Sequence, residues 1–278
     1  MRYCDLHTHS VYSDGTFTPA ELIAAGQKAG LVAMALTDHN TVAGLPDFLK
    51  AAENSGLEAV PGVEFSTDYG VTELHILALY VKPEHYAPIT QLLEGAARRK
   101  EESNIALIEN LNRAGYHISY ADIKAKTPNG QVNRAHIAAE LIQKGYTADR
   151  QEAFKTLLSP KRGYYQPPVR IGSYDAIRFI KSLGAVAVLA HPFLSLDEES
   201  LRAFLPEAVA CGLDGMETVY SKYSPEETAL AIRIAQEFGL KNSGGSDFHG
   251  QNKPDIAIGT GRGDLKIPVE WMETLRPI

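Results

Sequence analysis

Short apolar segments that read as β-strands alternate with helical patterns in the first and last parts of this chain, and this alternation constrains the fold most. The β-like segments are residues 3–6, 32–36, 57–60, 73–80, 185–190 and 213–219, and a further short strand ends near residue 247. Two intervening helices begin with an N-cap hydroxyl, a proline and then a glutamate, at Thr18 and Ser224. Alternating strands and helices favour a mainly parallel sheet.

The middle of the chain has a different character. From about residue 88 to residue 163 the apolar side chains recur at helical spacing, as at Ile105 and Ile108, and no convincing strand is visible. We therefore interpret 88–163 as an all-helical insertion. It interrupts an α/β domain made of residues 1–87 and 164–278.

Composition excludes several classes of protein. With 278 residues, 44% of them hydrophobic, the chain can bury a large core. Charged residues make up 22% and form no long single-sign run, which disfavours disorder. The net charge of −7 disfavours nonspecific coating of nucleic acid, but an anionic substrate remains compatible if bound cations supply local positive charge.

The cysteines and the apolar stretches bear on location. Cys4 and Cys211 give no disulfide framework and suit a reducing compartment. The first residues lack the apolar core of a signal peptide, and the longest apolar stretch is too short to cross a bilayer. The sequence thus predicts a cytoplasmic enzyme without membrane contact and without a stable protein partner.

Side chains that can bind metal ions fall at or just after the predicted strands. These are His7 and His9 after the first strand, Asp38 and His39 after the second, Glu64 after the third, His191 after a later one, and Asp247 and His249 after the last. In parallel α/β folds, functional groups gather at the carboxyl ends of strands. We therefore expect these positions to converge on one rim.

The spacing and number of these residues indicate more than one ion. Two imidazoles at positions i and i+2 of a strand, as in His7-Thr8-His9, point to the same face and can grip one cation. The full set of candidate ligands is His7, His9, Asp14, His39, Glu64, His75, His191, Asp247 and His249. One tetrahedral zinc takes about four ligands, so nine suit two or three divalent cations with a bridging carboxylate. Clustered cations serve phosphoryl chemistry, because they generate hydroxide near neutral pH and neutralise phosphate oxygens.

Some of these positions have alternative roles. Asp14 could instead form the Ser13-Asp14-Gly15 turn, although we favour a ligand. Asp38 could replace His39 as the ligand, but we expect Asp38 to support the ligands from behind. Glu73 is expected to face away from the neighbours of His75.

A series of motifs, in order along nearly the whole chain, resembles the PHP (polymerase and histidinol phosphatase) family. They are His7-Thr8-His9-Ser10, Ser13-Asp14-Gly15, Thr37-Asp38-His39, Gly62-Val63-Glu64-Phe65-Ser66, His75, Ala190-His191-Pro192 and Gly245-Ser246-Asp247-Phe248-His249. The resemblance implies a distorted seven-stranded (β/α)7 barrel with a trinuclear metal centre, and a helical insertion that covers the active site. Mn²⁺ is the favoured ion, and Zn²⁺ or Fe²⁺ also suit these ligands.

Within the insertion, Asn133-Arg134-Ala135-His136-Ile137-Ala138 resembles a stretch of small bacterial members that act as 3',5'-nucleoside bisphosphate phosphatases or short-RNA exonucleases. Asn133 and Ala135 stand where Gly and Pro are expected. The resemblance makes Arg134 and His136 candidates for holding a substrate phosphate near a helix start; the alternative is an exposed helix face. Lys161 and Arg162 are a second phosphate candidate. Either Tyr164 or Tyr165 could stack on a base or pack in the core.

The expected activity is hydrolysis of the 3'-phosphate of a nucleoside 3',5'-bisphosphate, with Asp247, His191 and His249 as catalytic candidates and either histidine as proton donor. The substrate would be a small phosphorylated nucleotide, with short oligoribonucleotides also compatible. Alternatives are a 5'-3' exonuclease on short RNA and a histidinol-phosphate phosphatase. Further alternatives are an amidohydrolase, which also begins with a His-x-His motif but often needs a bridging lysine, and an inert metal-binding module, which should have lost ligands.

Overall fold

The computed structural model describes residues 2–127 and 132–277. The chain divides into two compact units. One comprises Met1–Gln91 with Arg170–Ile278, and the other comprises Leu92–Val169. We call them the barrel unit and the helical unit.

Seven strands of the barrel unit form a nearly closed sheet, which is the distorted barrel expected from the sequence. They are β1 (Tyr3–Asp5), β2 (Ala33–Leu36), β3 (Glu58–Tyr69), β4 (Thr72–Leu79), β6 (Val186–Leu189), β7 (Gly215–Tyr220) and β8 (Lys241–Gly245). Their order is β8-β7-β6-β4-β3-β2-β1. Two short strands add to this ring: β9 (Ile267–Pro268) pairs with β1, and β5 (Ile171–Gly172) pairs with β3.

The ring closes where β8 meets β1. The backbone N–H of Leu6 donates to the carbonyl of Gly244 at 3.2 Å, and the N–H of Asp247 donates to the carbonyl of His7 at 2.8 Å. A Cβ at Gly245 would collide with the Cβ and backbone of His7, so only glycine permits this approach. The closure brings the residues that follow β1 and the residues that follow β8 to the same place on the rim of the barrel.

The expectation of a mainly parallel sheet holds for two stretches and fails between them. β1, β2 and β3 are parallel neighbours, as are β6, β7 and β8, whereas β4 is antiparallel to both β3 and β6. The reason is a tight turn at Gly70, whose φ of +60° lets β3 fold directly back as β4 without a helix between them. Glu64 therefore lies inside the long strand β3, opposite Leu77, and not after its end as predicted.

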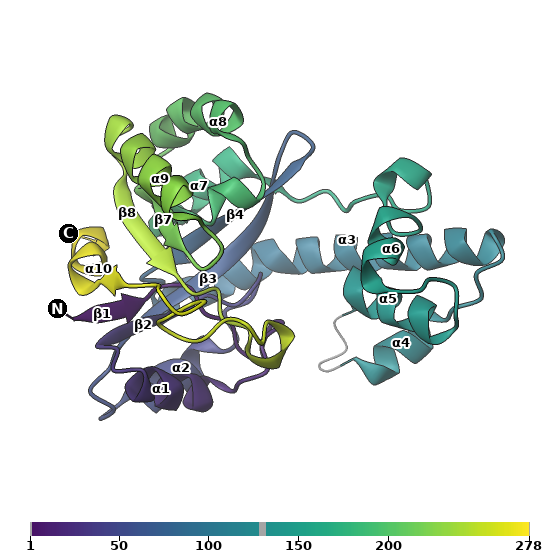
Figure 1. The fold of residues 1–278 in the computed structure, drawn as a ribbon, viewed down its shortest axis with the longest axis horizontal. Helices are drawn as coiled ribbons and strands as arrows, with labels where there is room; N and C mark the ends of the chain where they lie inside the picture. Colours follow the sequence, from purple (N-terminus) through teal and green to yellow (C-terminus); the bar gives the residue numbers. More distant parts are fainter. Residues whose placement is uncertain (1, 128–131, 278) are drawn as a thin grey trace. The chain divides into compact units, whose positions relative to one another are not determined.

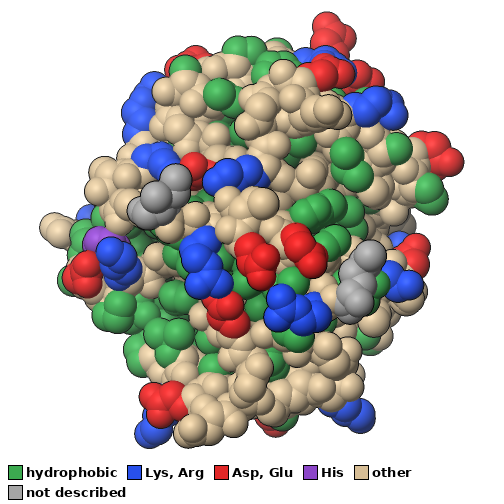
Figure 2. Space-filling view, turned by 90° about the vertical axis from the view of Figure 1, so that its left-hand side faces the viewer, with side chains coloured by type: hydrophobic (Ala, Val, Ile, Leu, Met, Phe, Trp, Pro, Cys, Tyr) green, Lys and Arg blue, Asp and Glu red, His purple; other side chains and the backbone are tan. Residues whose placement is uncertain are grey.

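Helices pack on the outside of the barrel, with α1 beside α2 and α7 beside α8 (Figure 1). The barrel unit contains α1 (Pro19–Lys28), α2 (Leu45–Ala52), α7 (Ser173–Ser182), α8 (Glu198–Ala210), α9 (Pro225–Glu237) and α10 (Val269–Leu275), and the short helices η1 (Pro83–His85), η4 (Pro192–Leu194) and η5 (Gly250–Asn252). The predicted capping boxes at Thr18 and Ser224 are both formed. The surface seen in Figure 2 intersperses acidic and basic side chains, in keeping with the absence of single-sign runs.

Small and branched apolar side chains fill the barrel interior. Ala33 and Ala35 of β2 face the same core cluster as Val188 of β6, whereas Met34 and Leu36 of β2 are also fully buried. Both faces of β2 are therefore covered, which explains its continuous apolar sequence. This packing holds the strand ends, and the polar side chains they carry, in fixed positions.

The regular structure of the helical unit is helical throughout its described residues. It contains α3 (Tyr86–Arg113), which begins in the barrel unit, and α4 (Tyr120–Lys126), α5 (Arg134–Gln143), α6 (Arg150–Lys155) and η3 (Pro160–Arg162). The segment 164–169, which follows η3, also belongs to this unit, because side chains of α3 donate to its backbone. Arg99 donates to the carbonyl of Val169 at 2.7 Å, and Ser103 donates to the carbonyl of Gln166. The unit thus ends later than residue 163. No helix in the described residues is long and apolar enough to span a membrane.

Candidate metal centre

His7 and His9 leave β1 in an extended conformation and point to the same side, as their spacing predicts. Thr8 points the other way, and its hydroxyl donates to the carbonyl of Ala35 at 2.6 Å. The Nε2 atoms of His7 and His9 lie 3.0 Å apart, and both side chains are fully buried. Two buried imidazole nitrogens therefore face one point.

Polar side chains in or after the other strands of the barrel ring lie around the Nε2 atoms of His7 and His9. His39 follows β2, Glu64 and His75 lie within β3 and β4, His191 follows β6, and Asp247 and His249 follow β8. Asp14 comes from the loop after β1. We call the nine predicted ligands, which the structure brings together, the metal cradle. Their role as ligands stays a prediction.

Glu64 lies at the centre of the metal cradle, where both of its oxygens contact imidazole nitrogens. Its Oε2 lies 3.1 Å from His7 Nε2, 3.2 Å from His9 Nε2 and 3.0 Å from His39 Nδ1. Its Oε1 lies 2.7 Å from His75 Nδ1 and 3.1 Å from His191 Nε2. A fully buried carboxylate that contacts several imidazoles with both oxygens has the geometry of a bridging ligand.

Asp247 and Asp14 serve the other side of the metal cradle. Asp247 Oδ1 lies 3.2 Å from His9 Nε2 and 3.4 Å from His249 Nδ1. Asp14 Oδ1 lies 3.2 Å from His249 Nε2, and its Oδ2 lies 3.9 Å from His39 Nε2. Asp14 thus turns toward the imidazoles, although its loop position also fits the turn role.

The two buried carboxylates are held ionised by the imidazoles around them. Burial alone would raise the pKa of Glu64, but His39 and His7 bring it well below its usual range. Burial likewise opposes ionisation of Asp247, yet the hydrogen bond from His9 and the charge of His7 hold the pKa of Asp247 well below normal. Negative charge is therefore fixed in the centre.

The imidazoles divide into two groups. Burial would lower the pKa of His9 and His75, but neighbouring carboxylates raise these pKa values to about 9 and about 10. Burial dominates at His39, whose pKa falls to about 3, and it also lowers the pKa of His249. Without cations the centre therefore keeps protons on some nitrogens beside its carboxylates.

These donors fit divalent cations. Nitrogen and carboxylate oxygen ligands suit Zn, Mn and Fe. Four overlapping groups of three or four side chains place one ligand atom each within 4.8 Å of one another. Among the described residues, the buried Nδ1 of His9 has no hydrogen-bond partner. An unpartnered buried nitrogen beside carboxylates is what a cation would satisfy.

Sequence reasoning missed three side chains that contact the metal cradle from behind. Glu217 of β7 lies 3.0 Å from His7 Nδ1 and accepts a 2.7 Å hydrogen bond from the backbone N–H of His191. Tyr220 donates to Asp247 Oδ2 at 2.7 Å, and Lys253 contacts the same oxygen at 2.6 Å. The available signal was Glu217 itself, a charged residue in the middle of the strand predicted at residues 213–219.

Glu73, which was expected to face away from the neighbours of His75, contacts His75 itself. Positions i and i+2 of a strand share a face, and Glu73 Oε1 lies 3.4 Å from His75 Nε2. Glu73 Oε2 also lies 2.7 Å from Arg170, which contacts Asp68 at 2.9 Å. Glu73 thus joins His75 to an ion-paired network.

Both carboxylate oxygens of Asp38 accept hydrogen bonds from the loop after β1, in keeping with the supporting role expected for this residue. Its Oδ1 accepts from the Ser10 backbone N–H at 2.7 Å and from the Ser13 hydroxyl at 2.6 Å. Its Oδ2 accepts from the Ser10 hydroxyl at 2.6 Å. The side chain therefore fixes the loop that carries Asp14.

Arg134 and His136 lie at the start of α5, in the helical unit. Asn133 caps this helix and accepts from the backbone N–H groups of Ala135 and His136, so these amides already have a partner and an anion would depend on side chains. His136 Nδ1 in turn accepts from the Asn133 N–H at 3.2 Å, which leaves the proton on Nε2. The guanidinium of Arg134 lies over the Tyr165 ring, 4.4 Å from its centroid.

The surroundings of His136 are positive. Burial lowers the pKa of His136, and the charges of Lys100 and Arg150 lower it further. No carboxylate among the described residues forms an ion pair with Arg134. We call Lys100, His136 and Arg150, together with Arg134 two residues before His136 on α5, the basic cluster.

Lys161 and Arg162 form η3, and both are exposed. Arg162 and Tyr164 line a pocket of about 230 Å³ together with Tyr116, Tyr146, Thr147, Glu152, Thr156 and Leu157. Tyr165, by contrast, is 5% exposed and belongs to the core of the helical unit. Of the two tyrosines, Tyr164 thus lines a pocket, whereas Tyr165 packs in the core with Arg134 over its ring.

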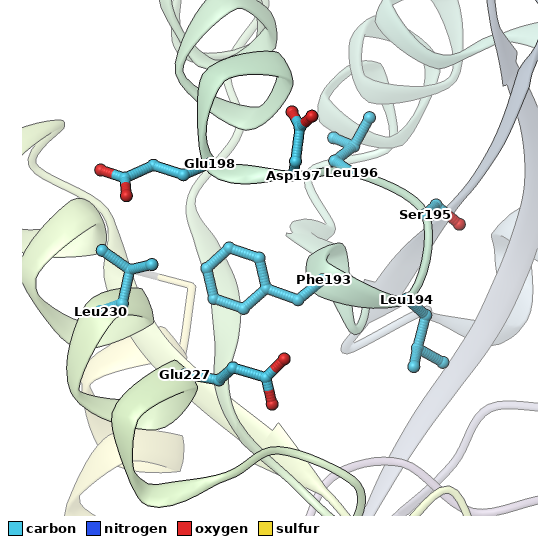
Figure 3. Close-up of a pocket in the computed structure, with 8 residues that line it drawn as sticks. All are labelled: Phe193, Leu194, Ser195, Leu196, Asp197, Glu198, Glu227 and Leu230. Carbon is cyan, nitrogen blue, oxygen red and sulfur yellow. The ribbon is translucent and has the colours of Figure 1, made fainter.

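A second pocket, of about 500 Å³, lies on the barrel unit beside the turn that follows His191 (Figure 3). The Phe193 ring points into the space between Glu198, Leu230 and Glu227. Asp197 also lines the pocket. Three carboxylates around an apolar floor do not suit a phosphate.

Curated relatives match most of this chain. It is 33% identical to a 5'-3' exoribonuclease of Haemophilus influenzae, over 88% of this chain and 89% of the relative. It is 30% identical to a phosphoribosyl 1,2-cyclic phosphate 1,2-diphosphodiesterase of Eggerthella lenta, over 89% and 94%. It is 28% identical to a 3',5'-nucleoside bisphosphate phosphatase of Chromobacterium violaceum, over 93% and 91%.

Solved structures match the whole fold. A protein from Bifidobacterium adolescentis, described as a metal-dependent phosphoesterase, superposes with a TM-score of 0.81 at 29% identity, over 99% of this chain and 95% of the other. A Chromobacterium violaceum protein described as an amidohydrolase, with bound sulfate and no metal, gives a TM-score of 0.82 at 27% identity, over 99% and 98%.

The barrel, its rim of imidazoles and carboxylates, and these similarities define a metal-dependent phosphoesterase. The model of the PHP domain matches residues 5–160, and the chain belongs to that family.

Proposed function

We propose that the metal cradle binds two or three divalent cations, with Glu64 shared between them. Mn²⁺ is the favoured ion, and Zn²⁺ or Fe²⁺ are compatible. The contacts of both Glu64 oxygens with imidazoles support this assignment. When bound, the cations would lower the pKa of a water molecule and offset charge on phosphate oxygens.

The substrate that fits best is a nucleoside 3',5'-bisphosphate, cleaved at its 3'-phosphate. The observation that carries this proposal is that Lys100 and Arg150 lie close enough to His136 to lower its pKa, in a chain with a net charge of −7. Arg134 and the Nε2–H of His136 can donate charge-assisted hydrogen bonds to a second phosphate. The acidic pocket beside Phe193 is unsuited to that role.

The proposed reaction is hydrolysis of one phosphorus–oxygen bond. Water adds to the phosphorus of the 3'-phosphate, and the bond from phosphorus to the 3'-oxygen breaks. The products are inorganic phosphate and a nucleoside 5'-monophosphate. Asp247 orients His9 and His249, and either His191 or His249 would deliver a proton to the departing 3'-oxygen.

A 5'-3' exoribonuclease activity on short RNA is the second candidate. Cleavage at the same 3'-oxygen would release the same nucleoside 5'-monophosphate, with the rest of the RNA in place of phosphate. The 33% identity to the Haemophilus influenzae exoribonuclease favours it. The pocket lined by Arg162 and Tyr164 also favours it, because tyrosine rings stack on bases without sequence preference.

Steady-state kinetics with added Mn²⁺ tests both candidates. The substrates are adenosine 3',5'-bisphosphate, adenosine 3'-monophosphate, a short 5'-phosphorylated RNA and histidinol phosphate. We expect the highest kcat/KM with the bisphosphate and a higher KM with the monophosphate, which lacks the second phosphate. A higher kcat/KM with the RNA would select the second candidate, and equal values for both adenosine substrates would contradict a role for the basic cluster.

A further inference from the structure

Glu217 is a carboxylate without exposure to solvent, and it lies within β7 next to Met216 and Thr218, which are also buried. A charged side chain in such a place needs partners that compensate its loss of hydration. It has two: the ring of His7 and the backbone N–H of His191. Both partners belong to residues of the metal cradle.

The contact with His7 determines which ring nitrogen can face a cation. Glu217 Oε1 lies 3.0 Å from Nδ1, whereas Nε2 at the opposite edge lies 3.0 Å from His9 Nε2 and 3.1 Å from Glu64 Oε2. A carboxylate can only accept, so Nδ1 must carry the proton. When a cation displaces any proton from Nε2, the lone pair of Nε2 is directed into the metal cradle.

The contact with His191 holds a backbone in an uncommon conformation. His191 has φ +29° and ψ 54°, which side-chain-bearing residues rarely adopt. Its N–H donates to Glu217 Oε2 at 2.7 Å. In this conformation its Nε2 reaches Glu64 Oε1 at 3.1 Å.

Glu217 forms one of the four possible ligand groups together with His7 and His191. Its hydrogen bonds nevertheless argue against a role as a direct metal ligand. Its Oε2 accepts a hydrogen bond from the backbone N–H of His191, in the turn after β6. Binding a cation through this oxygen would compete with that hydrogen bond. The other faces Nδ1 of His7, at the ring edge away from His9 and Glu64. Its two oxygens are thus occupied by donors of two different residues of the metal cradle.

We propose that Glu217 is a positioning residue, which selects the Nδ1–H form of His7 and fixes the backbone of His191, so that both imidazoles are preset to receive cations. This inference rests on the proposed metal binding. Carboxylates that accept from the second nitrogen of a ligating histidine orient the ring and raise its basicity. Glu217 would do this for one ligand and fix the backbone of another.

The test is Glu217→Gln in the full chain, with Zn²⁺ as the probe. The amide oxygen of glutamine can still accept from the His191 N–H. Its NH2 group would then face Nδ1 of His7 and can only donate, which favours a proton on Nε2 of His7. We expect zinc affinity, measured by calorimetry, to fall by roughly 10- to 100-fold. The exposed Glu237→Gln on α9 is the matched control and should bind zinc like the wild type.

Nitrogen NMR of the histidine rings in the zinc-loaded protein provides a readout that a purely structural role would not change. We expect His7 to keep its proton on Nδ1 and to bind zinc through Nε2 in the wild type. This measurement decides the question even if the glutamine variant does not fold. Zinc on Nδ1 of His7 would overturn the proposal.

The remaining outcomes separate this inference from the proposed function. Equal zinc affinity in wild type and Glu217→Gln would overturn the role of Glu217 alone. Loss of one bound ion with the others unchanged would make Glu217 a direct ligand, which also overturns it. Failure of the wild type to bind zinc or Mn²⁺ would overturn the metal centre itself.

Discussion

The metal cradle and the basic cluster differ in how firmly the fold holds them. The cradle residues sit in or next to strands of one nearly closed sheet, and His7, His9 and Glu64 have no solvent exposure. The basic cluster lies on helices of a separate unit, with Lys100 and Arg150 exposed. The proposed chemistry therefore depends on rigid, buried geometry, whereas the proposed substrate selection depends on side chains that can change at little cost to the fold.

The largest effect should follow from removing a central ligand. His9→Ala or Asp247→Ala should abolish turnover and reduce the metal bound per chain, because each contacts several other cradle residues. Elemental analysis and a phosphatase assay check this. The exposed His117→Ala is the control. Full activity in both cradle variants would refute the ligand assignment.

Metal binding should weaken as the pH falls. The raised pKa values of His9, about 9, and His75, about 10, mean that these nitrogens hold protons at neutral pH in the metal-free protein. Cations need the neutral rings, so binding must release protons, and affinity should fall roughly tenfold per pH unit for each proton displaced. Calorimetry in buffers of different ionisation enthalpy counts these protons; a heat independent of the buffer would contradict the expectation.

A change in the basic cluster should alter selection without removing chemistry. Arg134→Ala should raise KM for adenosine 3',5'-bisphosphate by roughly 10- to 100-fold, the size of a charge-assisted hydrogen bond, and leave the bound metal unchanged. The KM for adenosine 3'-monophosphate should stay constant. Arg233→Ala, at an exposed position of α9, is the matched control and should leave both KM values unchanged. Equal losses with both substrates would contradict the assignment of Arg134 to a second phosphate.

The smallest effect should come from the network behind His75. Glu73→Gln keeps the side-chain shape but weakens the contacts with His75 and Arg170. We expect metal affinity to fall by up to about tenfold, the lower end for partners of metal ligands. Titration with Mn²⁺ measures this. A loss as large as that of His9→Ala would mean that Glu73 is itself a ligand.

The sequence was sufficient to predict that the nine residues of the metal cradle lie together, because residues that follow parallel strands lie on the same rim of the barrel. It was insufficient for Glu64, which was expected after a strand and lies within one, since the turn at Gly70 lets β3 continue and pair with β4. His75 was predicted as a candidate ligand, but its contact with Glu73 was not.

The supporting residues were harder to predict for a different reason. Glu217 and Lys253 contact His7 and Asp247 only because the ring closes and because β7 lies beside β8. These neighbours depend on sheet order and register, which local patterns do not encode. The same holds for Arg134, whose packing on Tyr165 joins residues far apart in the chain.

The most direct test of the shared cradle is a crystal structure of the Mn²⁺-loaded protein, with anomalous diffraction to locate the ions. The account predicts two or three manganese peaks among the imidazoles, with a Glu64 oxygen on more than one of them. A single peak away from Glu64, or none within reach of His7, His191 and Asp247, would contradict it.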